Sequence, residues 1–366
     1  MKILIACGGS GGHIFPATAL AKCLKDSNKD IDLLFVGSNS ALDKRIFEKE
    51  HLNCRFLSSN KLPYGRSLKT LVFFIKLFFD TLKAFLILAK YSPDVVVGFG
   101  GYVSSPVIFA AYVLRIPRIV HEQNVVPGRA NTVLFRFADK IALSFEETRK
   151  YLGRFNSKAV FTGNPIRMTL LNNARDVNIR KFGLNPGKFT ILIIGGSQGA
   201  HNLNEAFMGA LSGIDKESIP LLQAIHITGM ADYEWANNAY EDIGLEHRVF
   251  SFIDNIEEAY SVSDLVVTRS GASAIFEIAY YGLPMILIPY PFAMSHQVEN
   301  ARVFSGNGAA IQIDEKDLTG NVMKDSIEKL LNNRVMLDQM GKKARTLSVP
   351  HSSDNLASEV LKISKR

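Results

Sequence analysis

ILIACGGSGGHIFPATALAKCL, residues 3–24, joins a short apolar strand to a glycine-rich turn and then to a helical stretch. ILIIGGSQGAHNLNEAFMGAL, residues 191–211, repeats this order in the second half of the chain. A strand that passes through a glycine-rich turn into a helix is how a doubly wound α/β domain begins. The sequence therefore predicts an α/β protein with two tandem Rossmann-like domains.

The other apolar runs fit the same plan. Runs of Val, Ile and Leu between helical stretches indicate buried parallel strands. We expect such strands at residues 33–37, 94–99, 118–120, 226–228, 264–268 and 285–290. The turn-like cluster Gly163-Asn164-Pro165 predicts the join, with one domain at residues 1–163 and the other at 164–350. A final helix within 351–366 is expected to pack back on the first domain.

The composition limits the class of protein. The chain has 366 residues, which fits two domains at about 150 residues each. With 47% hydrophobic and 21% charged residues it is globular, which excludes a collagen, a disulfide mini-protein and a polytopic membrane protein. Cys7, Cys23 and Cys54 have no metal-like spacing and fit reduced thiols in a cytosolic protein. The net charge of +7 fits an anionic partner, which is nucleic acid, an anionic membrane or a phosphorylated ligand.

One predicted helix is basic and unusually apolar. LVFFIKLFFDTLKAFLILA, residues 71–89, contains three charged side chains, so it is too interrupted for a membrane span. Lysines at every seventh position form one stripe along a helix, at 69, 76, 83 and 90. The segment 68–90 either covers one side of the sheet with its lysines in water or also contacts an anionic bilayer. Both hold if the helix is half buried.

Three glycine-rich turns need an explanation, at residues 8–12, 98–101 and 195–199. Glycines let backbone N–H groups approach a phosphate, although a tight strand-to-helix turn is the alternative. A dinucleotide-binding site requires an acidic residue where the second strand ends, and this chain has Val36-Gly37-Ser38 there. A P-loop requires a lysine where this chain has His13.

Polar side chains follow several strands, where open α/β sheets bind ligands. RSGAS at 269–273 starts a helix and is a candidate anion site, and Glu277 either binds a ribose diol or complements the helix dipole. His121-Glu122-Gln123-Asn124 and His296-Gln297 are placed similarly. His13 can act as a base, as an acid or as a hydrogen-bond donor to a phosphate, or it can cap the helix. The sequence has no Asp-x-Asp pair between a strand and a helix and no two-histidine helix motif, so no metal site is predicted.

Six segments together resemble the MurG family, the GT-B N-acetylglucosaminyltransferases of bacterial peptidoglycan synthesis. They occur in the family's order and spacing: GGSGGHIFPATALA (8–21), GFGGYVSSP (98–106), HEQN (121–124), GNPIR (163–167), GGSQGAHNLN (195–204) and RSGASAIFEIAYYGLP (269–284). The resemblance covers nearly the whole chain. It implies a GT-B fold with a cleft between the domains, and inverting transfer of GlcNAc from UDP-GlcNAc to the C4 hydroxyl of MurNAc in lipid I. The products would be lipid II and UDP, made without a metal or cofactor by a peripheral enzyme on the cytoplasmic face of the cell membrane.

The resemblance also implies roles for individual residues. The second domain would bind the donor through the Ile253 backbone at uracil, Glu277 at the ribose and Gln297 at the GlcNAc hydroxyls. The diphosphate would meet Arg167, Ser197 and the start of the helix formed by Ala272, Ser273, Ala274, Ile275 and Phe276. From the first domain, the residues expected to close over the donor are Ser10, Gly11, Gly12 and Asn124. The acceptor would face Gly100, Gly101 and Tyr102.

The expected chemistry follows from the charges that develop in the reaction. Helix N-termini, loop N–H groups and Arg167 stabilise the leaving UDP, and a base removes the acceptor's proton. We expect His13 to be this base, with Glu122 as second choice, although Glu122 could instead orient His121 or cap the loop. The loop N–H groups and Arg167 suit a phosphate, and the lysine stripe suits an anionic membrane surface, so no nucleic acid partner is expected. Three alternatives are another GT-B transferase acting on a lipid such as diacylglycerol, a non-catalytic binding module, and an NAD-dependent oxidoreductase.

Overall fold

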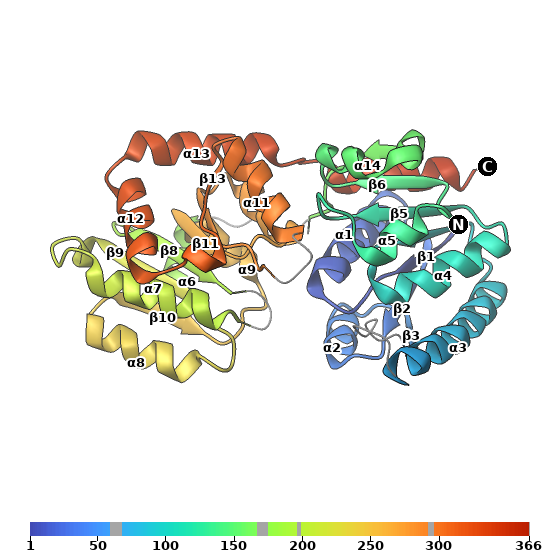
Figure 1. The fold of residues 1–366 in the computed structure, drawn as a ribbon, viewed down its shortest axis with the longest axis horizontal. Coiled ribbons are helices and arrows are strands. Elements are labelled where there is room, and N and C mark those ends of the chain that lie inside the picture. The colour runs from blue at the N-terminus through green and yellow to red at the C-terminus, as the bar shows by residue number, and fades with distance from the viewer. Residues whose placement is uncertain (59–67, 167–174, 196–198, 292–295, 366) are drawn as a thin grey trace. The chain divides into compact units, whose positions relative to one another are not determined.

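The structure is a computed structural model that describes residues 1–58, 68–166, 175–195, 199–291 and 296–365 (Figure 1). The chain divides into two compact units. Unit 1 comprises Met1–Met168 with His351–Arg366, and unit 2 comprises Thr169–Pro350. Each unit is described separately below.

Unit 1 is built on a seven-stranded parallel sheet in the order β3-β2-β1-β4-β5-β6-β7. The strands are β1 (Lys2–Ala6), β2 (Asp32–Ser38), β3 (Cys54–Leu57), β4 (Val95–Gly98), β5 (Arg118–Glu122), β6 (Lys140–Leu143) and β7 (Ala159–Phe161). The helices are α1 (Gly11–Ser27), α2 (Ala41–Lys49), α3 (Leu68–Tyr91), α4 (Gly101–Val113), α5 (Arg129–Leu134) and α14 (Ser352–Ile363), with 3-10 turns at Glu146–Tyr151 and Gly153–Lys158.

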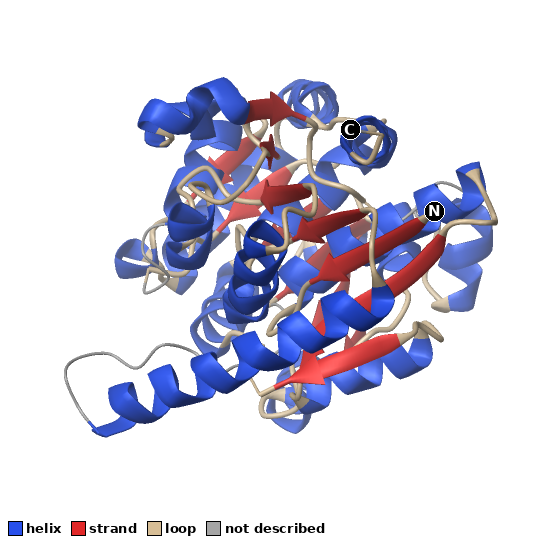
Figure 2. Cartoon of the chain, turned by 90° about the vertical axis from the view of Figure 1, so that its right-hand side faces the viewer, coloured by secondary structure: helices blue, strands red, loops and turns tan. Residues whose placement is uncertain are grey.

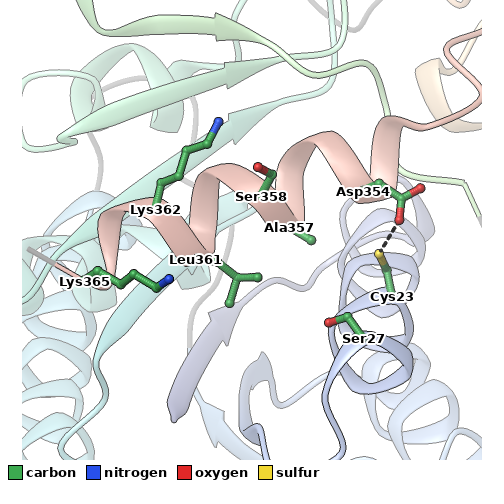
Figure 3. Close-up of a pocket in the computed structure, with 8 residues that line it drawn as sticks. All are labelled: Cys23, Ser27, Asp354, Ala357, Ser358, Leu361, Lys362 and Lys365. Atoms are coloured by element: carbon green, nitrogen blue, oxygen red, sulfur yellow. Dashed lines mark hydrogen bonds between the residues drawn. The ribbon is translucent and has the colours of Figure 1, made fainter.

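Alternation along β1 gives this sheet two apolar faces. Ile3 and Ile5 point into a core that includes α1 and α14, whereas Leu4 points into a second core with α3 and α4. The final helix α14 packs along α1, where Cys23 Sγ donates a hydrogen bond to Asp354 Oδ1 at 3.3 Å (Figure 3). The chain therefore returns to unit 1 after completing unit 2.

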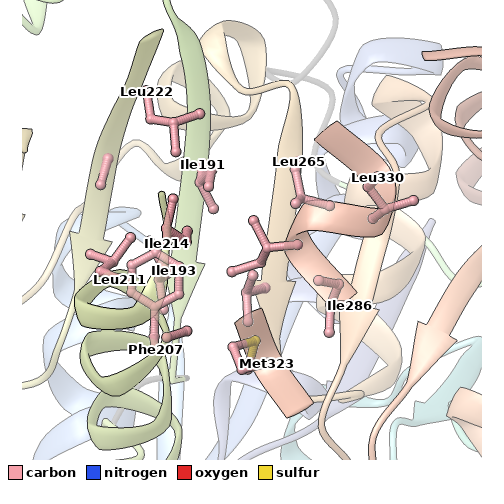
Figure 4. Packing of buried hydrophobic residues seen from close by; sticks show 14 of the residues in the cluster. Ile191, Ile193, Phe207, Leu211, Ile214, Leu222, Leu265, Ile286, Met323 and Leu330 are labelled. Carbon is pink, nitrogen blue, oxygen red and sulfur yellow. The ribbon is translucent and has the colours of Figure 1, made fainter. Parts of the chain in front are cut away.

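Unit 2 is built on a six-stranded parallel sheet in the order β10-β9-β8-β11-β12-β13. The strands are β8 (Phe189–Ile194), β9 (Leu222–Ile227), β10 (Glu246–Phe250), β11 (Leu265–Thr268), β12 (Met285–Leu287) and β13 (Ala310–Gln312). The helices are α6 (Arg175–Lys181), α7 (His201–Gly213), α8 (Tyr233–Ile243), α9 (Ile256–Val262), α10 (Ala272–Tyr281), α11 (His296–Gly306), α12 (Gly320–Leu331) and α13 (Arg334–Leu347), with 3-10 turns at Ile219–Leu221 and Glu315–Asp317. Figure 4 shows Ile191 and Ile193 of β8 packed with Phe207 of α7 and Leu265 of β11.

The prediction of two Rossmann-like domains is confirmed, because both sheets are parallel and place their first strand centrally. In each sheet the strand order reverses beside that first strand, so its glycine-rich turn lies at a switch point where such folds bind ligands. Several predicted strand boundaries were wrong, and β9 begins at Leu222 instead of residue 226. β5 continues through His121 and Glu122 instead of ending at residue 120, and β12 ends at Leu287 instead of 290.

Helix α3 has one buried and one exposed face. Ala84 and Leu88 are buried, and the buried Asp80 accepts hydrogen bonds from Ser58 N and Oγ at 2.9 and 3.0 Å. The exposed face is apolar and comprises Leu71, Val72, Phe74, Ile75, Phe78, Phe79, Leu82 and Leu86. Figure 2 shows α3 as the long helix at the lower left. Among the described residues, no helix is long and apolar enough to span a membrane.

The described lysines of the expected stripe on α3 are all exposed, and one of them also contacts the sheet. Lys83 Nζ donates a hydrogen bond to the Phe56 carbonyl at the end of the sheet, at 2.8 Å. Lys76 and Lys90 are exposed. The side chain of Lys69 lies outside the described residues. Lys83 and Asp80 therefore attach the helix to unit 1, while Phe74, Phe78 and Phe79 remain exposed.

Candidate active site

The glycine-rich turns after β1 and β4 meet around His13. A Cβ atom on Gly101 would lie 2.9 Å from Gly8 O and 3.4 Å from His13 Nδ1, and one on Gly100 would lie 3.5 Å from His13 Cδ2. Gly100 and Gly101 have φ values of +84° and +72°, which L side chains rarely adopt. The structure thus brings His13 together with the two glycines expected on the acceptor side.

The imidazole of His13 is oriented by the loop that precedes it. Its Nδ1 lies 3.1 Å from Gly8 O and 3.1 Å from Ser10 Oγ. Because a carbonyl oxygen only accepts hydrogen bonds, Nδ1 carries the proton and Nε2 keeps its lone pair in the neutral ring. Burial lowers the pKa of His13, and this effect outweighs the opposing effects of the Gly8 hydrogen bond and the charge of Asp43. The ring is therefore neutral at physiological pH and is equipped to accept a proton at Nε2.

Glu122 holds the loop that follows β5. Its carboxylate is almost completely buried and accepts hydrogen bonds from the backbone N–H groups of Asn124 and Gly128 at 2.9 and 3.0 Å. It also accepts from the side-chain amides of Asn131 at 2.8 Å and Asn124 at 3.3 Å. This geometry favours the loop-capping role for Glu122 over a role as base.

His121 is a buried neutral histidine. Its Nε2 lies 3.3 Å from Gly163 O, and its Nδ1 lies 3.1 Å from Gln123 Nε2. Burial lowers its pKa to about 4, against the opposing hydrogen bond to Gly163. Its ring also packs on Phe99 at a centroid distance of 5.0 Å. These contacts make His121 a structural support for the site.

Two contacts near the turns were not anticipated from the sequence. The buried carboxylate of Asp43, on α2, accepts a hydrogen bond from Gly9 N of the first turn. Ser40-x-x-Asp43 has the pattern of a helix cap, and nothing in that pattern pointed to the turn. The ring of Tyr102 meets Phe73 of α3 edge-on, with centroids 5.8 Å apart. The acceptor-side turn is therefore in direct contact with the apolar helix.

In unit 2 the glycine-rich turn after β8 approaches the end of β9. A Cβ atom on Gly199 would lie 2.4 Å from Thr228 O, so only glycine fits there. Behind the turn, Asn204 Nδ2 donates to Thr228 O at 3.0 Å and to Asp232 Oδ2 at 2.7 Å. Asn204 Oδ1 lies 3.0 Å from Nε2 of the buried His226. This polar network fixes the start of α7.

Glu315 joins the starts of two helices in unit 2. Its carboxylate pairs with the Arg269 guanidinium, which lies between β11 and α10, and accepts from Asn202 Nδ2 on α7 at 2.9 Å. Although burial raises the pKa of Glu315, the Arg269 guanidinium holds it below its ordinary value. The side chain of Arg269 therefore has a structural role.

The predicted donor-side residues of α10 and α11 lie near the ends of β11 and β12. Glu277 is buried in α10, where Tyr260 Oη donates to its Oε2 at 3.4 Å. Gln297 Oε1 accepts from Tyr290 N at 3.0 Å, and its backbone carbonyl accepts from Ser270 Oγ at 2.8 Å.

The remaining predicted residues divide into three groups. Ile275 N–H donates to Gly271 O within α10, whereas Ala272, Ser273 and Ala274 form the first turn of that helix. The side chain of Phe276 is buried. A second group of predicted residues is partly or fully exposed and comprises Ser10, Gly11, Gly12 and Ile253. Arg167 and Ser197 lie outside the described residues.

The described residues contain no group of three or more His, Cys, Asp or Glu side chains that could hold a metal ion.

Both halves of the chain match models of known domains. Residues 3–143 match the glycosyltransferase family 28 N-terminal domain, and residues 190–356 match its C-terminal domain. A protein of Halothermothrix orenii, named UDP-N-acetylglucosamine--N-acetylmuramyl-(pentapeptide) pyrophosphoryl-undecaprenol N-acetylglucosamine transferase, is 38% identical over 97% of both chains. A protein of Halalkalibacterium halodurans with the same name is 36% identical over 100% of both chains.

Solved structures agree with these matches. The crystal structure of Acinetobacter baumannii MurG superimposes with a TM-score of 0.77 and 28% identity, covering 99% of this chain and 100% of that one. The UDP-GlcNAc 2-epimerase of Neisseria meningitidis, bound to UDP-GlcNAc, has a TM-score of 0.68 at 12% identity and covers 99% and 100% of the two chains. The second likeness shows a shared fold only.

Proposed function

The chain belongs to glycosyltransferase family 28, among the UDP-N-acetylglucosamine--N-acetylmuramyl-(pentapeptide) pyrophosphoryl-undecaprenol N-acetylglucosamine transferases, and from this we propose that His13 is the base of the transfer reaction. The reaction moves GlcNAc from UDP-GlcNAc to the C4 hydroxyl of MurNAc in lipid I and yields lipid II and UDP. The observation that carries the proposal is the neutral, loop-oriented imidazole of His13 between two glycine-rich turns.

Unit 1 activates the acceptor. His13 Nε2 takes the proton of the C4 hydroxyl while the hydroxyl oxygen forms its bond to the anomeric carbon of GlcNAc. The bond from that carbon to the diphosphate oxygen breaks, and UDP leaves with the electron pair. Attack opposite the leaving group inverts the anomeric centre. Gly100 and Gly101 border His13, which supports their assignment to the acceptor side, and we assign the neighbouring Tyr102 there with them.

Unit 2 binds the donor. The helix N-termini of α7 and α10 offer backbone N–H groups and positive dipole ends to the diphosphate, and Arg167 and Ser197 are assigned there with them. The buried carboxylate of Glu277 accepts hydrogen bonds from the ribose diol, because a carboxylate has acceptor sites for two hydroxyl groups. We assign the backbone of Ile253 to uracil and the side chain of Gln297 to the GlcNAc hydroxyls.

The exposed face of α3 brings the enzyme to its lipid-borne acceptor. Phe78 and Phe79 are 60% and 62% exposed, and Lys76 and Lys90 lie on the same helix. Phenylalanines inserted at the headgroup boundary and lysines near anionic lipids favour peripheral binding to a bilayer. We propose that this helix attaches the enzyme to the cytoplasmic face of the cell membrane.

A direct assay tests this function. Purified full-length protein is incubated with radiolabelled UDP-GlcNAc and either lipid I or diacylglycerol, with and without a chelator. We expect labelled lipid II from lipid I only, at a rate that the chelator does not change. Labelled diacylglycerol, or no product from lipid I, would overturn the acceptor assignment. Loss of activity with chelator, restored by a divalent ion, would overturn the metal-free mechanism.

A further inference from the structure

Asp43 is a fully buried carboxylate that makes more hydrogen bonds than a helix cap requires. It lies in the first turn of α2, where Asp43 N donates to Ser40 Oγ at 3.1 Å. Its carboxylate accepts from Ser40 Oγ at 2.8 Å and from Ser38 N and Oγ at 2.8 and 2.7 Å. It also reaches outside the helix to Gly9 N, at 3.0 Å from Oδ1 and 3.1 Å from Oδ2. All four partners are donors, as suits an ionised carboxylate.

The peptide group between Gly8 and Gly9 links Asp43 to His13. Its N–H belongs to Gly9 and donates to the Asp43 carboxylate, whereas its C=O belongs to Gly8 and lies 3.1 Å from His13 Nδ1. A peptide group is planar and rigid, so fixing its N–H also fixes the direction of its carbonyl. Hydrogen bonds in series polarise one another, so a carboxylate at one end strengthens the carbonyl as an acceptor at the other.

The chain is shaped to allow this link. A Cβ atom on Gly8 would lie 2.3 Å from Asp43 Oδ2 and 2.9 Å from Ser38 N. Gly9 has a φ of +82°, in the region that favours glycine. Two glycines are therefore needed for the turn to come close to the carboxylate.

We propose that Asp43 is a positioning residue for His13 and acts through the Gly8–Gly9 peptide. The proposal rests on the proposed function of His13 as base. Asp43 holds the Gly8 carbonyl against Nδ1, which keeps the lone pair of Nε2 directed at the acceptor. When Nε2 takes the proton, the ring becomes positively charged, and the buried carboxylate stabilises that charge through the polarised peptide.

The charged groups around His13 are consistent with this role. The charge of Asp43 raises the pKa of His13 against the lowering caused by burial. On the other side, Glu122 lies behind Asn131 and accepts a hydrogen bond from its Nδ2 at 2.8 Å. The nearby thiol of Cys7 is neutral, because burial raises its pKa well above the ordinary value.

The test compares Asp43→Asn with the unmodified chain in the lipid I assay across pH. Loss of the carboxylate should lower kcat about tenfold or more, with little change in the KM for UDP-GlcNAc. The acidic limb of the kcat profile should move to lower pH, because His13 loses the negative charge that favours its protonated form. Asp139→Asn is the control: it removes a carboxylate paired with Arg118 at the opposite end of β5, and kcat should stay within about twofold.

Two further measurements separate a link to His13 from a general structural role. In a His13→Ala background, Asp43→Asn should cause no additional loss of kcat, since the group it positions is gone. In the unmodified chain, nitrogen NMR of the neutral His13 ring should show the proton on Nδ1, so the idea stays testable even if the variant does not fold. Independent losses in the double variant, or a proton on Nε2, would overturn the proposal. Absence of lipid I transfer in the unmodified chain would instead overturn the proposed function.

Discussion

Burial sets the protonation state of His13, and this gives a prediction for activity. The pKa of His13 lies below its ordinary value because the ring is desolvated. A base must be deprotonated, so a lowered pKa keeps it active at more acidic pH. The acidic limb of kcat with saturating lipid I should therefore lie below about pH 6.5, the ordinary pKa of histidine. A pH profile of initial rates measures this, and a limb at or above that pH would contradict the assignment.

The same residue can be tested by truncation. His13→Ala should lower kcat by about 10²–10⁴-fold, the usual contribution of a general base. The KM for UDP-GlcNAc should change little, since the ring faces the acceptor-side glycines. A variant with near-normal kcat at saturating lipid I would show that another group removes the proton. Ser364→Ala, at the end of the chain and far in sequence from the turns, provides a control with unchanged kcat.

At the residue scale, the sequence placed His13 and the glycine-rich turns together but missed Asp43. The two glycine turns follow strands, and strand-to-turn-to-helix order is visible in a single sequence. Asp43 is 34 residues from Gly9, and its local pattern is that of a helix cap. Glu122 was left open between base and loop cap. The four donors around its carboxylate, which favour the loop cap, come from residues two to nine positions away and depend on how the loop folds.

At the scale of elements, the exposed face of α3 predicts a separable membrane-binding function. The double variant Phe78→Ser and Phe79→Ser should bind anionic phosphatidylglycerol vesicles more than tenfold more weakly, because each buried phenylalanine contributes about 1.5–3 kcal/mol. Its thermal stability should hardly change, since both side chains are exposed. Vesicle co-sedimentation measures the binding. Val335→Ser, which changes an exposed apolar residue of α13, should bind like the unmodified chain. Equal binding by the α3 variant would refute this role.

Helix α3 also shows what periodicity can predict. Its spacing predicted a long helix with a wide apolar face, and the structure has one. Periodicity could not predict the hydrogen bonds of Asp80 and Lys83, because their partners, Ser58 and Phe56, lie in another part of the chain. The apolar periodicity of a helix predicts its buried and exposed faces. The contacts of its charged side chains depend on which other segments of the chain pack against it.

At the scale of the whole molecule, internal repetition was the strongest signal. Two strand–glycine turn–helix segments predicted two parallel sheets, and the fold is confirmed by both domain models and by the MurG structure. The order of the strands was not predicted, although it follows the usual pattern of doubly wound sheets. The ion pair between Glu359 of α14 and Lys140 was not predicted either, because the two residues lie far apart in the sequence.

That contact gives a prediction for stability. Glu359 on α14 pairs with Lys140 on β6 and with Lys362, whose Nζ lies 2.8 Å from Glu359 Oε1. Burial alone would raise the pKa of Glu359, but the two lysines hold it below the ordinary value. Glu359→Gln should lower the free energy of unfolding of unit 1 by about 1–3 kcal/mol at pH 7. Urea unfolding, followed by a probe in unit 1, measures the difference.

The pH dependence of that difference identifies its origin. A carboxylate with a lowered pKa contributes fully above its unfolded pKa of about 4.3 and loses its contribution as pH falls through the folded pKa. The gap between Glu359→Gln and the unmodified chain should therefore close below about pH 4. Glu146→Gln removes the more exposed ion pair with Arg149 in the same unit and should cost at most about 0.5 kcal/mol. If both variants behaved alike, α14 would be held by its apolar contacts with α1, with no measurable share from Lys140.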